Sequence, residues 1–373
     1  MRVGIITIHN HNNYGAILQA YALNKIVRRL GHQCKTIDCN IDPGSNRLFR
    51  KARHPGERIT NLYNLCRWRA NKLHTRRFRD FIRQQIPLTE ASYDSIERLY
   101  ADPPKFDAYI TGSDQVWRPH YLDQKIGAAF HLNFISPDQS RLISYAPSFG
   151  VSRIPEHHAK ILGEYLRRYH FLSVRERRAQ EIIFELSGRK AEQVVDPTLL
   201  LLAEDYEAIV QLPAFTSEYV LVYPMELGKN RAFFNLVNEV KRSTGLPIVC
   251  VLPLVFDFRW LMIADRVVLD AGPSEFLGLF KNASIVCTNS FHGTVFSMLY
   301  QKNFFGVPHS GTNSRQYSLL ETAGLLDRQL EDVSGRAVRD MLKNSIQYST
   351  VNRKLQASID RSIQFLVDAL GNR

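Results

Sequence analysis

The sequence predicts two α/β domains, each a parallel sheet whose strands alternate with helices. The first observation is the length, because 373 residues exceed what a single hydrophobic core usually serves. The second is the alternation of short apolar runs with helical segments, which is typical of parallel sheets. The third is that the alternation starts again after Asp196-Pro197. We expect an N-terminal domain over 1–200, a C-terminal domain over 201–345, and a terminal helical segment over 346–373 that packs back on the body.

The N-terminal domain begins as a Rossmann-like unit. The run Val3–Ile8 predicts a buried strand, and after a polar turn the residues Ala16–Leu30 carry apolar side chains at helical spacing up to Gly31. The glycines do not follow G-x-G-x-x-G, so a dinucleotide-binding fingerprint is absent. Further strands are expected at Cys34–Cys39, Asp107–Ile110 and Arg141–Ala146, and the run Tyr165–Leu172 leads into the next turn.

The C-terminal domain shows the same alternation. Runs rich in β-branched residues predict strands, and amphipathic segments between them predict helices, so a second parallel sheet is expected. The strands are expected at Tyr219–Tyr223, Leu246–Leu252, Val267–Leu269 and Ser284–Cys287. The helices are expected at Arg231–Arg242, Ser274–Lys281 and, at the end of the chain, Ser349–Leu370.

The composition predicts a cytoplasmic protein. No uninterrupted run of about 18 apolar residues occurs, and the first residues, MRVGIITI, match a buried strand better than a signal peptide. The cysteines are odd in number and widely spread, without a C-x-x-C pair or zinc spacing. We therefore expect no metal and reduced, structural thiols at Cys34, Cys39, Cys66, Cys250 and Cys287.

The net charge of +12 is concentrated in residues 47–83, which hold twelve Lys or Arg against two acids. Aromatic and aliphatic residues lie between these charges, which predicts a basic amphipathic helical segment. A solvated helix face and an anionic membrane surface are equally good interpretations. A nucleic acid ranks last, since no nucleic-acid-binding motif accompanies the charge. The basic residues are Arg47, Arg50, Lys51, Arg53, Arg58, Arg67, Arg69, Lys72, Arg76, Arg77, Arg79 and Arg83.

The stretch from Ile285 to Phe296, IVCTNSFHGTVF, is the most informative part of the sequence. An apolar run predicts a buried strand, and after a small polar turn a helical pattern begins near His292. Ligands of parallel sheets bind where strands end, and the start of a helix offers free N–H groups to an anion. Because histidine also exchanges protons near neutral pH, His292 is either an acid/base group at an anion site or a cap of the helix.

Six segments of the chain carry a further pattern. They are Gly4–Leu23 (GIITIHNHNNYGAILQAYAL), Thr111–Trp117 (TGSDQVW), Ile143–Gly150 (ISYAPSFG), Ser173–Arg178 (SVRERR), Asp196–Leu200 (DPTLL) and Thr288–Ser297 (TNSFHGTVFS). In this order and at these separations they resemble the polysaccharide pyruvyl transferase family, over nearly the whole chain.

This resemblance implies the transfer of a pyruvyl group from phosphoenolpyruvate to sugar hydroxyls, in which a pyruvate ketal forms during the assembly of an exopolysaccharide or capsule. It also implies two Rossmann-like domains that face a central cleft, similar to the GT-B glycosyltransferases. The expected partners are phosphoenolpyruvate and a saccharide acceptor, free or lipid-linked, with no cofactor. A lipid-linked acceptor would place the protein at the inner face of the cell membrane.

The resemblance assigns residues of both domains to the donor. Arg175 matches the family arginine that binds phosphoenolpyruvate, and a surface ion pair with Glu176 or another acid is the alternative. His292 matches the family histidine, for which we expect an acid/base role. The turn around His292 contributes two further donor-binding residues, Ser290 and Gly293.

The chain departs from the family pattern beside His292. Many members carry Arg-Leu-His where this chain has Ser290-Phe291-His292, which removes a positive charge. We expect Arg315 to supply that charge, and the alternative is a salt bridge between Arg315 and Glu321.

Two loops that follow strands of the N-terminal domain are expected to bind the acceptor. Asp114 is the best candidate for a base that activates a sugar hydroxyl, although a helix cap is the commoner role at such a place. Asp196 before Pro197 is interpreted as a turn at the domain border. The expected acceptor-binding residues are Asn12, Asn13, Tyr14, Gly15, Ser113 and Gln115.

Two other functions compete with pyruvyl transfer. A GT-B glycosyltransferase would need a pocket for a nucleotide and a carboxylate for its ribose, and Glu275 is the one candidate carboxylate in the second domain. A non-catalytic protein that binds anionic surfaces would be built around residues 47–83.

Overall fold

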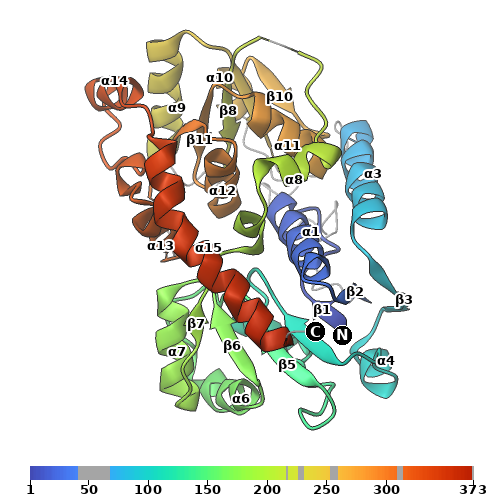
Figure 1. The fold of residues 1–373 in the computed structure, drawn as a ribbon. Coiled ribbons are helices and arrows are strands. Elements are labelled where there is room, and N and C mark those ends of the chain that lie inside the picture. The colour runs from blue at the N-terminus through green and yellow to red at the C-terminus, as the bar shows by residue number, and fades with distance from the viewer. Residues whose placement is uncertain (41–67, 216, 226–230, 253–258, 309–313, 372–373) are drawn as a thin grey trace.

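Two parallel β-sheets form the framework of the protein in a computed structural model (Figure 1). The structure describes residues 1–40, 68–215, 217–225, 231–252, 259–308 and 314–371. The predicted α/β class with two parallel sheets is confirmed, since one sheet lies within residues 2–193 and the other within 220–305.

The N-terminal sheet has seven strands in the order β3-β2-β1-β4-β5-β6-β7. The chain order reverses between β1 and β4, so the connections after these two strands leave on opposite faces and open a crevice between them. Residue Ile5 of β1 pairs with Thr36 on one side and with Ile110 on the other. The strands are β1 (Arg2–Ile6), β2 (Gln33–Cys39), β3 (Leu88–Tyr93), β4 (Ala108–Thr111), β5 (Arg141–Ser144), β6 (Phe171–Val174) and β7 (Glu192–Gln193).

The C-terminal sheet has five strands in the order β10-β9-β8-β11-β12. Its chain order reverses between β8 and β11, which creates a second crevice of the same kind. Among these strands the sequence did not predict β12, and β3 and β7 of the first sheet were missed as well. The strands are β8 (Val220–Tyr223), β9 (Ile248–Val251), β10 (Arg266–Val268), β11 (Ile285–Thr288) and β12 (Asn303–Phe305).

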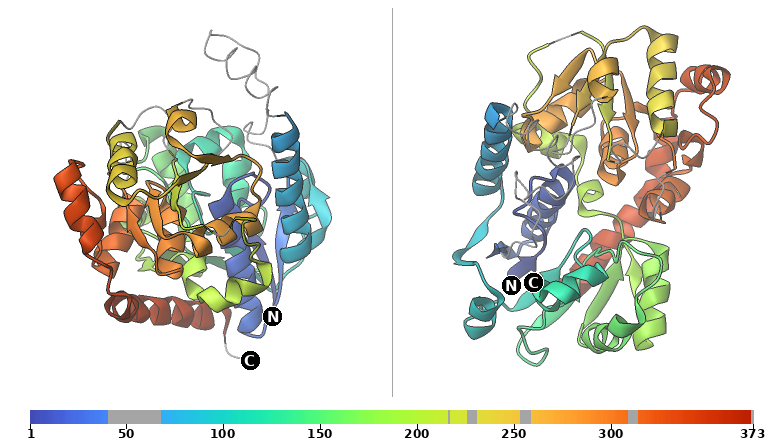
Figure 2. Two further views of the ribbon diagram at one scale, coloured as in Figure 1. Left: turned by 90° about the horizontal axis from the view of Figure 1, so that it is seen from above. Right: turned by 180° about the vertical axis from the view of Figure 1, so that it is seen from behind.

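Helices cover both faces of each sheet (Figure 2). Those between residues 14 and 200 are α1 (Tyr14–Arg29), α3 (Trp68–Gln85), α4 (Ile96–Ala101), η1 (Pro119–Gln124), α5 (Ile126–Phe130), α6 (Glu156–Arg167), α7 (Arg177–Ser187) and η2 (Pro197–Leu200). The later ones are α8 (Ala203–Tyr206), η3 (Glu207–Ile209), α9 (Arg231–Thr244), α10 (Arg259–Ile263), α11 (Pro273–Asn282), α12 (Phe291–Leu299), α13 (Ser314–Ala323), η4 (Leu326–Arg328), α14 (Gly335–Lys343) and α15 (Tyr348–Leu370). The η elements are 3₁₀ helices. None of the described helices is both long and apolar enough to cross a membrane.

Helix α1 lies between the two sheets and belongs to the core of both domains (Figure 2). Asn13 caps it by accepting a hydrogen bond from the N–H of Ala16 at 3.1 Å. Gly31 follows its end in the left-handed conformation, with φ at 89°, as the predicted glycine stop requires. Tyr14 stacks on Phe276 of α11 at 4.2 Å between ring centroids, so an aromatic contact joins the two domains here.

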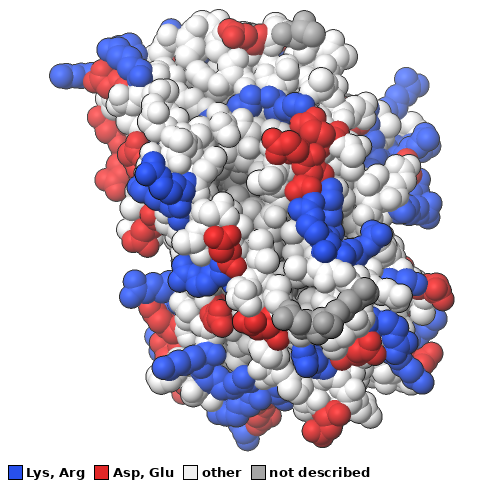
Figure 3. Space-filling model, in the orientation of Figure 1, with Lys and Arg blue, Asp and Glu red and all other residues white. Residues whose placement is uncertain are grey.

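Helix α3, the described part of the basic segment, also joins the domains. The remainder of that segment, residues 47–67, lies outside the described residues. Arg77 of α3 forms ion pairs with Asp270 at 2.9 Å and with Glu275 at 2.8 Å. The outward side of the helix carries Lys and Arg side chains that gather along the edge of the molecule (Figure 3). Arg77 therefore belongs to an interdomain contact and not to the solvated basic face.

Helix α15 runs diagonally from the C-terminal domain to the N-terminal domain (Figure 1). Near its end the carbonyl of Ala369 accepts a hydrogen bond from Arg141 of β5 at 2.9 Å. Further back the Oγ of Ser362 accepts one from the N–H of Val195 at 2.9 Å. The last helix thus ties the end of the chain to the first sheet.

The described cysteines are buried and form no disulfide with one another. They are Cys34, Cys39, Cys250 and Cys287, while Cys66 lies outside the described residues. Their burial agrees with the expected structural role.

Candidate active site

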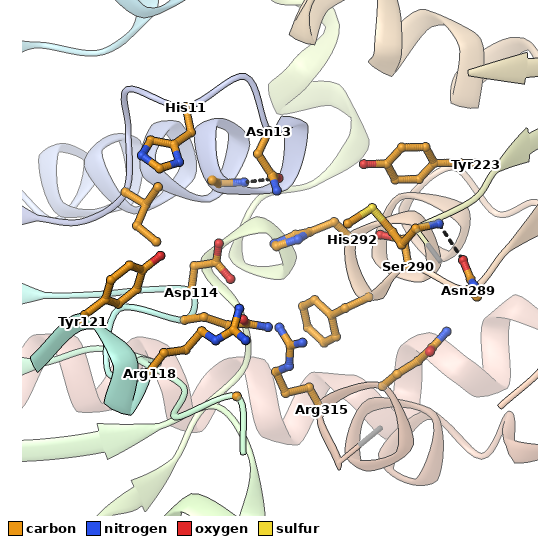
Figure 4. A pocket seen from close by; sticks show the side chains of 17 residues that line it. His11, Asn13, Asp114, Arg118, Tyr121, Tyr223, Asn289, Ser290, His292 and Arg315 are labelled. Carbon is orange, nitrogen blue, oxygen red and sulfur yellow. Dashed lines mark hydrogen bonds between the residues drawn. The ribbon is translucent and has the colours of Figure 1, made fainter. Parts of the chain in front are cut away.

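The crevices of the two sheets face each other across one cavity of about 390 Å³, here called the interdomain cavity (Figure 4). The loops after β1 and β4 line it from the N-terminal domain, and the ends of β8 and β11 line it from the C-terminal domain. Its residues are Ile8, His11, Asn13, Ala16, Asp114, Gln115, Arg118, Tyr121, Gly150, Tyr223, Met225, Asn289, Ser290, Phe291, His292, Arg315 and Gln316.

The loop after β4 holds Asp114 in an unusual backbone conformation. Asp114 has a φ of 70°, in the left-handed region that residues other than glycine rarely adopt. Its carbonyl accepts a hydrogen bond from the N–H of Ser148 at 2.8 Å, which stabilises this conformation from the neighbouring loop. Such strain persists only where the surrounding structure enforces it, and it concentrates at functional sites.

The turn after β11 has the strand, turn and helix order that the sequence predicts. Ser290 caps α12, because its Oγ accepts a hydrogen bond from the N–H of Gly293 at 3.3 Å. A side chain at position 293 would place its Cβ 2.3 Å from the Oγ1 of Thr288, so the turn requires glycine there. The capping role that was the alternative for His292 thus belongs to Ser290.

His292 lies where the two domains meet. The residue is 8% exposed, and it borders the interdomain cavity. Its Nε2 lies 3.5 Å from the Oδ2 of Asp196, a residue of the N-terminal domain. A Cβ on Gly15 would fall 2.0 Å from its Nδ1, so the imidazole packs directly against the backbone at the start of α1.

Arg175 forms a buried ion cluster behind the cavity. Its Nη1 lies 2.5 Å from Asp196 and its Nη2 lies 3.3 Å from Asp114. The ring of Phe291 packs against the guanidinium, whose carbon lies 4.5 Å from the ring centroid. Glu176, the expected alternative partner, is buried and accepts a hydrogen bond from the Oγ of Ser148 at 2.6 Å. Arg175 is therefore paired, but with two buried acids instead of a surface acid.

Charge coupling sets the protonation of this cluster. Burial opposes the ionisation of Asp196, but His292 and Arg175 outweigh it and hold the pKa of that carboxyl well below its usual range. For Asp114, burial is again outweighed by Arg175, and the pKa is lowered. Glu176 differs, because burial dominates and raises its pKa. Asp114 and Asp196 are therefore anionic at neutral pH.

Two guanidinium groups in the cavity have no carboxylate within 4.0 Å in the described part of the chain, those of Arg118 and Arg315 (Figure 4). The figure shows them pointing toward each other beside Asp114. The alternative pair of Arg315 with Glu321 is not formed. Burial and the nearby Arg175 lower the pKa of Arg315 to about 10, which leaves it charged at neutral pH. The cavity thus holds two cations free to meet an anion.

The expected acceptor residues divide into two groups. Asn13 and Gln115 line the interdomain cavity. Tyr14 does not, because its buried hydroxyl donates to the carbonyl of Ala271 at 2.8 Å. Ser113 is fully buried and donates to the carbonyl of Ala146 at 3.0 Å. The remaining two are Asn12, whose amide donates to Thr75, and Gly15, which supports His292.

Other site residues escaped the sequence prediction. Asp196 does make the expected turn, since its Oδ1 accepts a hydrogen bond from the N–H of Thr198 at 3.1 Å, but its Oδ2 also enters the ion cluster. Arg118 lies four residues after Asp114 in the same loop, and that proximity was a usable signal. Tyr223 ends a buried strand, where an aromatic residue usually indicates core packing and gives no signal of a site.

One group of metal-ligand type occurs in the described ranges, and it lies outside the lining of the interdomain cavity. It consists of Asp123, His157 and His158, whose ligand atoms all lie within 4.8 Å of one another. It therefore offers nothing to the chemistry of the cavity.

Comparisons with known proteins agree with this arrangement. A sequence profile described as polysaccharide pyruvyl transferase matches residues 13–311. A search of curated protein sequences gave no match. A Listeria monocytogenes structure described as a UDP-N-acetylglucosamine 2-epimerase has a TM-score of 0.56 at 11% identity and covers 99% of this chain and 96% of its own. The structure of a glycosyltransferase from Rickettsia africae has a TM-score of 0.52 at 10% identity. The match covers 100% of this chain and 99% of the glycosyltransferase. At these identities the likeness shows the fold alone, and it confirms the GT-B-like prediction.

The ion cluster generates a stability prediction. We expect Arg175→Ala to lower the free energy of unfolding by about 3–5 kcal/mol, because it leaves two buried carboxylates without their cation. Arg175→Lys keeps a positive charge, so its free energy of unfolding should fall clearly less than that of Arg175→Ala. Urea unfolding followed by circular dichroism measures both variants. Equal stability of Arg175→Ala and the wild type would contradict the assignment of a buried cluster.

Proposed function

Because the chain belongs to the polysaccharide pyruvyl transferase family, we propose that it transfers the pyruvyl group of phosphoenolpyruvate to sugar hydroxyls and forms a pyruvate ketal on a surface polysaccharide. The observation that carries this proposal is the pair of unneutralised guanidinium groups, Arg118 and Arg315, beside His292 in the interdomain cavity. Phosphoenolpyruvate brings a phosphate and a carboxylate on one carbon, so it needs converging cations and a group that exchanges protons.

The reaction can be written with its atoms balanced. C3 of phosphoenolpyruvate gains a proton and becomes a methyl group, and C2 becomes the electrophile. The first sugar hydroxyl forms a bond to C2 and loses its proton. The bond between C2 and the phosphate oxygen then breaks, the second hydroxyl adds, and its proton leaves with the phosphate. His292 is the group at the cavity wall that suits these proton transfers.

We propose that Arg118 and Arg315 make the first contacts with the donor anion, aided by Ser290 and Gly293 at the start of α12. Arg175 is occupied by Asp196 and Asp114, and the contact with Asp114 is the longer one, at 3.3 Å. A donor anion therefore reaches Arg175 by replacing Asp114. A guanidinium holds a phosphate or carboxylate through two hydrogen bonds, which supports this arrangement.

For the acceptor we propose the N-terminal wall of the cavity. Asp114 is ionised and borders the cavity, so it can accept a hydrogen bond from a sugar hydroxyl and orient it for attack, a weaker role than the base that the sequence suggested. Its lowered pKa weakens it as a base while Arg175 is paired with it. The amides of Asn13 and Gln115 supply further hydrogen bonds to sugar hydroxyls.

A glycosyltransferase that uses a nucleotide sugar is less well supported. Glu275, the candidate for a ribose contact, pairs with Arg77 at 2.8 Å and accepts a hydrogen bond from the N–H of Gly272 at 3.0 Å. The cavity of about 390 Å³ also lies near the lower end of the roughly 300–1,000 Å³ typical of ligand pockets. Both observations favour a small donor.

The proposed function is tested with purified protein, phosphoenolpyruvate and a panel of lipid-linked and synthetic glycosides. We expect phosphate release that depends on the acceptor, with the ketal detected on the glycoside by mass spectrometry. UDP-sugars serve as competing donors in parallel reactions. Transfer from a UDP-sugar without any phosphate release from phosphoenolpyruvate would overturn the proposal.

We predict that His292→Asn lowers kcat by roughly two to four orders of magnitude, the usual range for a general acid or base. Asparagine keeps a polar side chain of similar reach, so the KM for phosphoenolpyruvate should change little. Phosphate-release kinetics on the folded variant give both constants. A kcat within a few-fold of the wild type would mean that the proton donor is another group.

We predict that Arg315→Gln raises the KM for phosphoenolpyruvate by about one to two orders of magnitude, since a hydrogen bond to a charged group is worth about 1.5–3 kcal/mol. Arg242→Gln is the matched control, because Arg242 lies on the exposed face of α9 and pairs with Glu239. Phosphate-release kinetics on both folded variants give the KM for phosphoenolpyruvate. An equal effect of both variants would argue against a donor contact at Arg315.

We further propose that the protein works in the cytoplasm, attached to the inner face of the membrane through α3. The exposed basic residues of this helix repeat every three or four positions and form one stripe, whereas Asn71, His74, Phe78 and Phe81 point into the body. Trp68 is 53% exposed beside Lys72. A basic stripe with an exposed aromatic residue suits an anionic lipid surface. The stripe is Arg69, Lys72, Arg76, Arg79 and Arg83.

We predict that replacing Lys72, Arg76 and Arg79 by Gln weakens binding to anionic vesicles by about two orders of magnitude, at roughly 1 kcal/mol for each charge. Turnover on a soluble acceptor should stay unchanged. Arg77→Gln is the control, because Arg77 faces Asp270 and Glu275 and should not contribute to vesicle binding. Vesicle sedimentation at low and high salt measures the effect. Unchanged binding of the triple variant would exclude this surface.

A further inference from the structure

We infer that Asp196 is a positioning residue that orients His292 across the domain boundary, so that Nδ1 is the nitrogen that exchanges protons with the substrates. The identity of the substrates in this inference rests on the proposed function. The geometry of the imidazole, however, is a property of the free protein. It can therefore be tested without any reaction.

The two ring nitrogens of His292 lie in different surroundings. Nε2 is sealed from solvent and lies 3.5 Å from the Oδ2 of Asp196, an ion-pair distance without a hydrogen bond. Among the described acids only Asp196 lies within 4.0 Å of Nε2. Nδ1 packs against the backbone of Gly15, and the ring borders the interdomain cavity. Because Nε2 is sealed, Nδ1 is the ring nitrogen left to meet a substrate.

The carboxylate of Asp196 determines where the imidazole proton sits. An ionised carboxylate only accepts hydrogen bonds, and a neutral imidazole carries one N–H and one lone pair. With the carboxylate opposite Nε2, the stable tautomer has its proton on Nε2 and its lone pair on Nδ1.

Asp196 is itself held firmly, which a positioning residue requires. Its Oδ1 accepts hydrogen bonds from the N–H and the Oγ1 of Thr198, at 3.1 Å and 2.7 Å. Its Oδ2 binds Arg175 at 2.5 Å and accepts a hydrogen bond from the Oγ of Ser113 at 3.3 Å. The Asp196 side chain is fully buried, and these hydrogen bonds and ion pairs fix its orientation. The direction of its Oδ2 toward His292 is therefore set before any ligand binds.

Gly15 completes the arrangement from the opposite side. A methyl group there would lie 2.0 Å from Nδ1, so the ring reaches its position only because the side chain is missing. Gly15 and Asp196 belong to the N-terminal domain, whereas His292 belongs to the C-terminal domain. The oriented imidazole consequently exists only when the domains stand as they do here. This makes domain closure a condition for proton transfer.

This tautomer of His292 determines which ring nitrogen handles each proton of the reaction. The proton that C3 gains leaves from Nδ1 of the protonated ring, and the proton of the first sugar hydroxyl returns to Nδ1 as the C2–O bond forms. The proton on Nε2 stays opposite Asp196 throughout, so Asp196 gains none. This division of labour is the same physical logic by which a carboxylate orients a histidine in hydrolases.

The test is NMR of the full-length protein labelled with ¹⁵N-histidine, without substrate. Comparison with His292→Asn identifies the His292 signals. At a pH where the ring is neutral we expect a protonated Nε2 and an unprotonated Nδ1. In Asp196→Asn, whose amide can donate as well as accept, we expect the Nδ1–H form or a mixture. Asp114→Asn, the control, removes the other carboxylate of the cluster and should leave the tautomer unchanged.

A second variant covers the case in which Asp196→Asn does not fold. Gly15→Ala keeps every charge but should displace the ring, which shifts both nitrogen signals and lowers kcat at least about tenfold, with less change in KM. A wild-type Nδ1–H tautomer, or signals that neither Asp196→Asn nor Gly15→Ala moves, would overturn the inference. If the tautomer is as expected but phosphoenolpyruvate is not consumed, the proposed function fails and the positioning role stands.

Discussion

The buried carboxylate of Asp196 is the constraint on which the arrangement of this protein depends. Removing a carboxylate from water costs several kcal/mol unless cations and N–H or O–H donors replace the lost water. Arg175, Ser113 and Thr198 provide that replacement, and His292 approaches from the other domain. These residues come from the turn after β6, the loop after β4, η2 and α12, so one charge connects four separate parts of the chain. The interface between the domains is thereby specified by electrostatics as well as by apolar contact.

The sheet topology explains why the connected elements carry chemistry. Each sheet reverses its strand order once, between β1 and β4 and between β8 and β11, and the two reversals face one cavity. Structures described as an epimerase and a glycosyltransferase have a similar fold at 10–11% identity, so widely divergent sequences form this framework. The candidate site residues Asp114 and His292 lie just after the ends of strands β4 and β11. Function is thus a property of a few loop residues on a general scaffold.

The sequence allowed most strands, the first helix and the turn around His292 to be predicted, because these depend on local periodicity and on glycine stops. It also singled out Asp114, Arg175 and Arg315, which the fold brings to the cavity or to its rear wall. The pairing of Arg175 with Asp196 could not be predicted, since it depends on how distant loops fold together. The same is true of Arg77, whose partners lie about 190 residues further along the chain.

The division of charge around the cavity explains how one site can hold acids and yet attract an anion. Arg175 pairs with Asp196 behind the wall and with Asp114 at the wall, so both carboxylates are bound to a buried cation. In front of it Arg118 and Arg315 face the cavity without carboxylate partners, so their charge is available. A preorganised cation costs no reorganisation when an anion arrives, which is what makes such sites effective. The inner ion cluster therefore binds Asp196 and Asp114 to Arg175, and it leaves Arg118 and Arg315 without a carboxylate within 4.0 Å among the described residues, so an incoming anion can pair with them.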